Sequence, residues 1–251
     1  MSVEAGRSMP THEWWRPVDR ARLSVLCIPW AGAGATPFSS WPEHFADDVA
    51  LCGLRLPGRE SRFAEEPVEE LEPLVELLAD EVALLVPGEF ALVGHCSGAL
   101  LAFELTRELV RRGGPEPAHL VAASQVGPRV SGTPPDERRR PLWERVREAG
   151  QIDPRVLESD EMRALLEPAL AADLGISDGY VYRPGPQLDV PISVFAGSDD
   201  ERVTHTGLAC WQDETAGPFA LRRLEADHFF RGDAWPVLAA AVAGALGASS
   251  G

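Results

Sequence analysis

The chain has 251 residues, of which 39 are acidic and 23 are basic, so its formal net charge at pH 7 is -16. This acidic balance argues against a general nucleic-acid-binding protein and against a protein that binds anionic membranes. Hydrophobic residues make up 45% and charged residues 25% of the chain, a composition typical of a soluble globular protein with one substantial core. A local exception to the acidic character is the arginine run at residues 138–140.

Neither the N-terminus nor the cysteines indicate secretion. The first ten residues have no apolar core of the kind that a signal peptide needs, and no later run is long enough to span a bilayer. The cysteines lie far apart and form no C-x-x-C pair: Cys27, Cys52, Cys96 and Cys210. We therefore expect a cytoplasmic protein with free thiols, without disulfides and without a metal site.

Apolar runs alternate with helical periods along most of the chain. We expect an N-terminal arm over residues 1–22, docked by Trp14 and Trp15, then one domain over residues 23–247 and a flexible tail at residues 248–251. The expected strands are residues 23–28, 49–56, 90–93, 120–123, 192–196 and 219–224. The expected helices are residues 39–47, 71–86, 99–112, 206–215 and 234–246. Such alternation predicts an α/β fold, with a mostly parallel central sheet flanked by helices on both faces.

The alternation stops between residues 130 and 180. No strand is expected in this segment, and its sequence favours short charged helices, most clearly at residues 137–148 and 160–172. A helical insertion of this size between strand–helix units is most simply a lid over the site. We call residues 130–180 the lid.

A candidate nucleophile lies at residues 94–98, where the sequence G-H-C-S-G joins an expected strand to an expected helix. Small residues at both flanks permit a sharp turn that lifts the middle side chain, Cys96, out of the sheet and toward the N-terminus of the helix. That position favours an anion. The alternative is a glycine-rich turn with a buried structural cysteine, and the motif alone does not decide between the two.

A nucleophile of this kind needs a base and an acid that orients the base. In the expected fold, both should follow the nucleophile in the order acid, histidine, each after a strand. Asp200 follows the strand at residues 192–196, and His228 follows the strand at residues 219–224. We therefore expect a catalytic set of Cys96, Asp200 and His228, with Asp199 as the alternative acid. The other histidines, including His95, are expected to be structural.

These motifs resemble those of the type II thioesterases of polyketide and nonribosomal peptide biosynthesis, which are α/β-hydrolases. The resemblance spans nearly the whole chain and rests on five segments: I-P-W-A-G at residues 28–32, L-P-G-R-E at 56–60, G-H-C-S-G-A-L-L-A-F-E at 94–104, G-S-D-D at 197–200 and H-F-F at 228–230. It implies attack on an acyl thioester held on the phosphopantetheine arm of an acyl or peptidyl carrier protein, followed by release of the acid by water. It also implies an oxyanion hole made by the backbone N–H groups of Ala31 and Ser97, and no cofactor.

The chain departs from the family pattern at several positions around one pocket. Cysteine replaces the usual nucleophilic serine at position 96. Further departures are Trp30 in place of histidine, Ala33 in place of glycine, and Ala171 and Leu174 in place of the arginine and phenylalanine usual around Asp173. We expect Trp30 to contact the substrate, and we expect the changes together to alter the substrate or the outcome of the reaction.

Three functions follow from the resemblance and its departures. The leading hypothesis is hydrolysis of carrier-bound acyl or aminoacyl thioesters through an acyl-Cys96 intermediate. The second is transfer of the acyl group to another carrier or an amine, because a cysteine exchanges one thioester for another at nearly equal free energy. The third is a non-catalytic carrier-binding protein. We expect a monomer, with residues 138–140, Arg145 and Arg147 as candidate contacts to an acidic carrier or, alternatively, as a solvated charged face.

Overall fold

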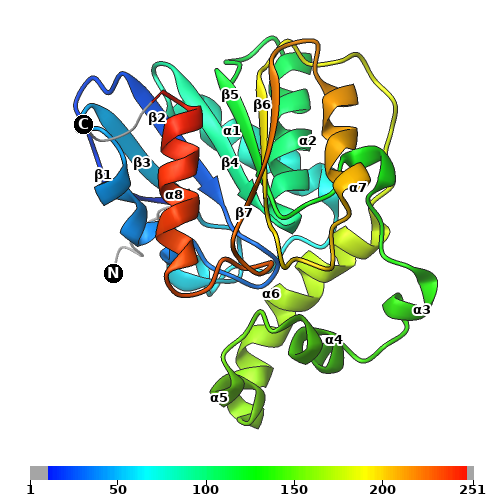
Figure 1. Ribbon diagram of the computed structural model, residues 1–251. Coiled ribbons are helices and arrows are strands. Elements are labelled where there is room, and N and C mark those ends of the chain that lie inside the picture. Colours follow the sequence, from blue (N-terminus) through cyan, green and yellow to red (C-terminus); the bar gives the residue numbers. More distant parts are fainter. Residues whose placement is uncertain (1–10, 248–251) are drawn as a thin grey trace, which may run out of the picture.

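The computed structural model describes residues 11–247, and the expected tail at residues 248–251 lies outside this range. One sheet of seven strands forms its centre, in the order β1-β3-β2-β4-β5-β6-β7 (Figure 1). The strands are β1 (His12–Arg16), β2 (Leu23–Ile28), β3 (Val49–Leu54), β4 (Phe90–His95), β5 (His119–Ala123), β6 (Ile192–Gly197) and β7 (Phe219–Leu224). Strands β2 to β7 pair in parallel, as expected for repeated strand–helix units.

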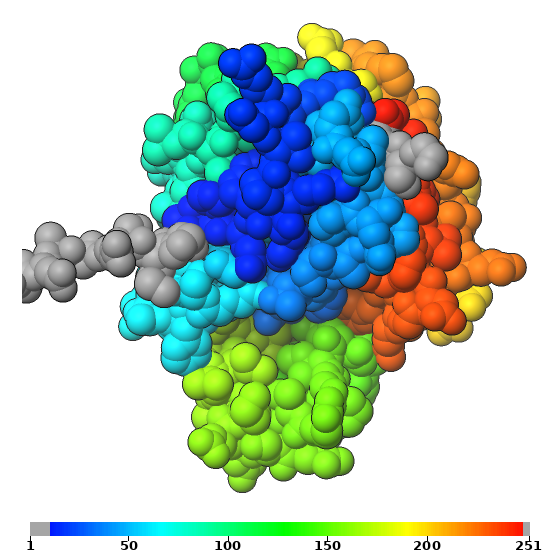
Figure 2. All heavy atoms as spheres, turned by 90° about the vertical axis from the view of Figure 1, so that its left-hand side faces the viewer, coloured from blue at the N-terminus to red at the C-terminus, as the bar shows by residue number. Residues whose placement is uncertain are grey.

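The prediction of an N-terminal arm over residues 1–22 is wrong for part of this range, because His12–Arg16 forms the edge strand β1. This strand pairs antiparallel with β3, and Trp14 lies opposite Cys52. Trp14 packs against the core on one face of the sheet and Trp15 against the core on the other, as alternate residues of a strand do. The tryptophans therefore dock this segment as expected, but as a strand. Figure 2 views the molecule from this edge.

Helices cover both faces of the sheet (Figure 1). On one face, α1 (Leu71–Leu85) and α2 (Ser97–Arg111) pack on the side chains of Leu26, Leu92 and their neighbours. On the other face, α8 (Ala234–Ala245) and the 3-10 segment η1 (Thr36–His44) bury Leu238 and Trp41 against the sheet. A regular α-helix was expected near η1, but its interior Pro42 has no N–H to continue one.

The expected helix at residues 206–215 is divided into α7 (His205–Ala209) and the 3-10 segment η4 (Cys210–Glu214). Two further 3-10 segments are η2 (Glu60–Arg62) and η3 (Pro128–Val130). None of the helices within residues 11–247 combines the length and the apolar character that crossing a membrane requires.

The lid is helical, as expected, and forms a lobe beyond one end of the sheet (Figures 1 and 2). It contains α3 (Pro135–Arg138), α4 (Leu142–Ala149), α5 (Pro154–Leu157) and α6 (Asp160–Gly179). The helix expected at residues 137–148 is interrupted before Pro141, because the residue preceding a proline disfavours the helical conformation. Helix α6 is longer than expected, and its buried residues include Leu170 and Asp173.

Candidate active site

Cys96 stands at a sharp turn between β4 and α2. Its backbone has φ 53° and ψ -125°, a strained conformation for a residue with a side chain. A Cβ on Gly94 would lie 2.2 Å from the carbonyl oxygen of Gly98, and a Cβ on Gly98 would lie 2.4 Å from the carbonyl oxygen of Pro29. Both glycines are therefore required for the strand and helix to approach this closely, and the turn holds Cys96 at the N-terminus of α2.

His228 and Asp200 lie together at the ends of neighbouring strands. The Nδ1 atom of His228 lies 2.8 Å from Oδ2 of Asp200, and both residues are buried, at 8% and 4% exposure. The other carboxylate oxygen of Asp200 accepts from the backbone N–H of Arg202 at 3.0 Å. Asp199 is exposed and bonds the neighbouring Ser198 hydroxyl instead. The geometry therefore selects Asp200 as the partner of the histidine.

Cys96 and His228 line one cavity of about 260 Å³ between the sheet and the lid. Burial raises the pKa of the Cys96 thiol, but the neighbouring His228, Arg202 and the Ser97 amide lower it by more, so its pKa lies below the usual range. Burial lowers the pKa of His228, whereas Asp200 and Cys96 raise it, to a net value of about 9. Each group therefore stabilises the charged form of the other, the thiolate of Cys96 and the imidazolium of His228.

The Nε2 atom of His228 is buried and makes no hydrogen bond of good geometry among residues 11–247. It belongs to the side of the ring opposite the Asp200 contact. Catalytic hydrogen bonds are often long or poorly aligned before substrate binds. This nitrogen is therefore available to exchange a proton with a group that reacts at Cys96.

Arg202 is a charged residue of the site that the sequence did not reveal. It lines the cavity with Cys96, and its guanidinium lies 6.0 Å from the centre of the Phe229 ring. Arg145, also on the cavity wall, is ion-paired with Asp178 at 2.7 Å. Within the described chain, the Arg202 side chain has no such carboxylate partner. Its positive charge contributes, after His228, to lowering the pKa of Cys96.

Both residues expected at the oxyanion hole reach the same cavity, whose lining includes Ala31 and Ser97. Ala31 lies in the loop at residues 29–34, which follows β2. Ser97 is the first residue of α2, where backbone N–H groups have no partner within the helix. The structure thus brings the expected nucleophile, base and oxyanion donors to one place.

Trp30 and His95 lie beside the cavity in an aromatic cluster. The Trp30 ring packs 5.2 Å from His95, 5.6 Å from Phe229 and 6.0 Å from Trp235. Trp30 does not line the cavity of Cys96 and His228, and its contact with the substrate stays a prediction. His95 is buried, and among residues 11–247 neither of its ring nitrogens has a hydrogen-bond partner. Its pKa is lowered to about 3, mainly by burial and to a smaller extent by the charge of the nearby His228. It is therefore a neutral packing residue.

The basic residues expected to contact a carrier are partly neutralised by the lid itself. Arg140 pairs with Glu137 and Glu148, and Arg145 pairs with Asp178. Arg138 donates to the backbone oxygen of Thr133 at 2.6 Å. These contacts favour the charged-face interpretation for Arg140 and Arg145. Residues 11–247 also contain no group of three or more His, Cys, Asp or Glu side chains placed to hold a metal ion.

The parallel sheet, the turn at Cys96 and the paired acid and histidine define an α/β-hydrolase. The family model for the thioesterase domain matches residues 24–246. The chain therefore belongs to the thioesterase family, the enzymes that hydrolyse thioester bonds, which confirms the expected family and argues against a non-catalytic protein.

The chain is similar to proteins of natural-product biosynthesis. It is 34% identical over 213 residues to the gramicidin S biosynthesis protein GrsT of Aneurinibacillus migulanus, covering 84% of this chain and 83% of that protein. The thioesterase RedJ of the prodiginine pathway of Streptomyces coelicolor superimposes with a TM-score of 0.81 at 34% identity, covering 96% of this chain and 90% of RedJ. The type II thioesterase BorB of the borrelidin cluster superimposes with a TM-score of 0.83 at 27% identity, over 97% and 99% of the two chains.

Proposed function

We propose that the protein cleaves acyl or aminoacyl thioesters of carrier proteins in a polyketide or nonribosomal peptide pathway, through an acyl-Cys96 intermediate. The observation that carries this proposal is the hydrogen bond of 2.8 Å between Asp200 and His228, beside a cysteine whose pKa is lowered. The family match and the biosynthetic pathways of GrsT, RedJ and BorB support the substrate class. The reaction requires no cofactor of the enzyme, because the phosphopantetheine belongs to the carrier.

The first half of the reaction transfers the acyl group to the enzyme. The Cys96 thiolate attacks the thioester carbonyl, and negative charge develops on its oxygen, where the backbone N–H groups of Ala31 and Ser97 stabilise it. When the carbon–sulfur bond to the carrier breaks, the His228 imidazolium donates its proton to the departing phosphopantetheine thiolate. Asp200 holds the imidazole in the orientation that places Nε2 toward the reacting atoms.

The second half releases the product. Neutral His228 accepts a proton from a water molecule, whose oxygen attacks the acyl-Cys96 carbonyl. The carbon–sulfur bond to Cys96 then breaks, and the carboxylic acid leaves. Because acyl-Cys96 is itself a thioester, a thiol or an amine can take the place of water at this step. Transfer to a second carrier or to an amine is therefore a second candidate function, and the cysteine nucleophile is the feature that favours it.

Acyl-loaded carrier protein distinguishes these outcomes. The protein is incubated with a small panel of acyl and aminoacyl carriers, with and without an unloaded acceptor carrier, and free acid and acylated acceptor are quantified by mass spectrometry. Hydrolysis predicts free acid in both conditions, and transfer predicts acylated acceptor at the expense of free acid. The Cys96→Ala variant is the control, and equal product from this variant and the unmodified protein would overturn the proposed intermediate.

A further inference from the structure

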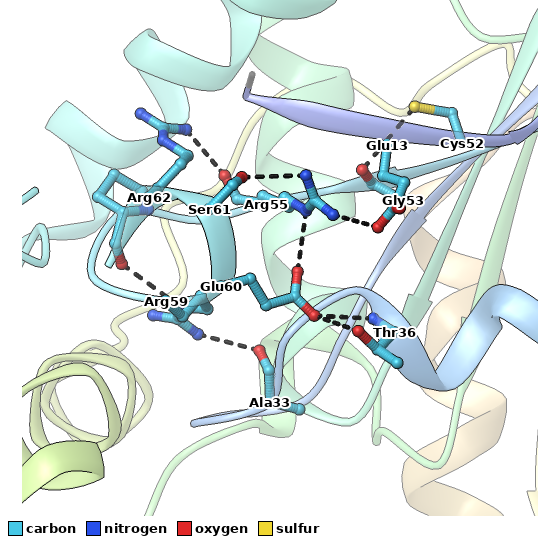
Figure 3. A network of polar contacts seen from close by, with 11 residues as sticks. Glu13, Ala33, Thr36, Cys52, Gly53, Arg55, Arg59, Glu60, Ser61 and Arg62 are labelled. Carbon is cyan, nitrogen blue, oxygen red and sulfur yellow. Dashed lines mark hydrogen bonds and ion pairs between the residues drawn. The ribbon is translucent and has the colours of Figure 1, made fainter. Parts of the chain in front are cut away.

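The loop at residues 29–34, which carries Ala31, is braced from one side by residues 55–62 (Figure 3). One carboxylate oxygen of Glu60 accepts from the backbone N–H of Thr36 at 3.0 Å and from its hydroxyl at 2.6 Å. Arg59 donates to the backbone oxygen of Ala33 at 3.2 Å. The L-P-G-R-E motif at residues 56–60 contains none of the proposed catalytic residues. These contacts indicate that it supports the loop instead.

The lid holds the same loop from the other side. Oδ2 of Asp173, in α6, accepts from the backbone N–H of Gly32 at 2.7 Å. The side-chain amide of Gln151 donates to the backbone oxygen of Ala31 at 3.2 Å. These two polar groups belong to one peptide unit, the Ala31–Gly32 amide. Because the lid contacts both its oxygen and its N–H, this planar unit cannot rotate while the lid is in place.

Helix α6 also lies too close to this peptide unit for a side chain at position 32. Gly32 has a φ of +74°, and a Cβ there would lie 2.7 Å from Cδ1 of Leu170. A positive φ strains residues other than glycine. Glycine at this position therefore serves both the turn and the close contact with the lid.

Arg59 and Asp173 join the two supports. The guanidinium of Arg59 donates two hydrogen bonds to the carboxylate of Asp173, at 2.6 and 2.9 Å. Both side chains are buried, at 7% and 8% exposure. Such a bidentate pair is geometrically restrictive, and separating it would leave a buried charge without a partner. The pair therefore fixes the distance between residues 55–62, the loop and α6.

We propose that Arg59 and Asp173 are positioning residues, and that they orient the Ala31 side of the oxyanion hole only while α6 is docked on the loop. The inference rests on the proposed function, because it assigns the pair a role in thioester cleavage. Movement of α6 away from the sheet removes the acceptor of the Gly32 N–H and releases the peptide unit next to the Ala31 donor. The position of the lid thereby determines both the access to Cys96 and the orientation of the Ala31 donor.

The test compares two reactions of the same thiol. Thioester cleavage develops an oxyanion, whereas alkylation by iodoacetamide forms a carbon–sulfur bond and expels iodide without one. Asp173→Asn keeps the shape of the side chain but removes its charge, and it cannot accept from Arg59 and Gly32 as the carboxylate does. We expect its kcat for an acyl-carrier thioester to fall about ten- to a hundredfold, the order of effect of a misplaced or lost oxyanion donor. Its alkylation rate at Cys96 should stay within about twofold, since the thiolate is unaffected.

Glu81→Gln is the matched control. Glu81 pairs with Arg62 at 3.1 Å, so the substitution alters an ion pair of residues 55–62 without touching the loop at residues 29–34. Both of its rates should equal those of the unmodified protein. If Asp173→Asn does not fold, the double variant Arg59→Met/Asp173→Leu removes both buried charges, and the same separation of the two rates is expected.

Undiminished thioester cleavage in Asp173→Asn would overturn the positioning role and leave the proposed function intact. An equal loss of both rates would also overturn it, because the substitution would then act on the thiol or on folding. If the unmodified protein alkylates rapidly at Cys96 but cleaves none of the thioesters, the proposed function itself fails, and the inference fails with it. These three outcomes are distinct in the same pair of assays.

Discussion

Replacing Asp200 by asparagine tests the electrostatic link between the acid, His228 and the Cys96 thiol. Burial lowers the pKa of His228, and the hydrogen bond that its Nδ1–H donates to Asp200 is the first of the interactions that raise it, from 6.5 to about 9. Since one pKa unit corresponds to about 1.4 kcal/mol, the folded environment favours the imidazolium by roughly 3 kcal/mol. Without the carboxylate, only the interactions with Cys96 oppose the effect of burial, and we expect the pKa of His228 to fall.

A neutral His228 no longer provides the positive charge that stabilises the Cys96 thiolate. The pKa of Cys96 then rises, because burial, which disfavours the thiolate, is opposed chiefly by His228. We expect the inflection of the Asp200→Asn alkylation profile to lie at least about one pH unit above that of the unmodified protein, so that at pH values well below both inflections its rate is lower by about tenfold or more. The rate is measured with iodoacetamide between pH 5 and pH 10 and followed by intact mass, and its inflection should move to higher pH.

Asp199→Asn is the matched control, because it makes the same chemical change one residue away at an exposed position without a contact to His228. Its alkylation profile should superimpose on that of the unmodified protein. The reasoning is refuted if the profile of Asp200→Asn also superimposes on it, or if both variants shift by the same amount.

Three other substitutions probe separate parts of the site. Arg202→Gln should move the alkylation inflection of Cys96 to higher pH, with partial rescue by Arg202→Lys, and an unmoved inflection would deny Arg202 its electrostatic role. Gly94→Ala should lower the free energy of unfolding in urea by about 1–3 kcal/mol, because the new Cβ meets the backbone oxygen of Gly98; an unchanged midpoint would contradict this. Cys96→Ser should lower the ratio of transfer to hydrolysis, measured with donor and acceptor carriers, and an unchanged ratio would deny the cysteine this role.

The parts of the structure that follow from local pattern were predictable from sequence. The apolar runs of β2 and β7 have the expected bounds, and the turn at Cys96 follows from its glycines. The order of Asp200 and His228 after successive strands also places them together, since parallel strands end at the same edge of a sheet. The five-residue edge strand β1 was missed, because its charged residues hide the alternation of its tryptophans.

Contacts between distant segments were not predictable in the same way. Arg59 and Asp173 are 114 residues apart, and Asp173 and Gly32 are 141 residues apart, so no local period relates them. No sequence motif identifies Arg202 as a residue of the site, because its role depends on where the fold places it relative to the cavity. The packing of Trp30 against His95 and Phe229 likewise joins segments that are distant in the sequence.

The central claim is that Cys96 carries the acyl group. Its most direct test is mass spectrometry of the protein after mixing with acyl-loaded carrier and digestion at low pH, where thioesters survive. The account predicts an added acyl mass on the peptide that contains Cys96, and its loss in Cys96→Ala. An adduct confined to another residue, such as the partly exposed Cys210, or free acid formed without an adduct and undiminished in Cys96→Ala, would contradict it.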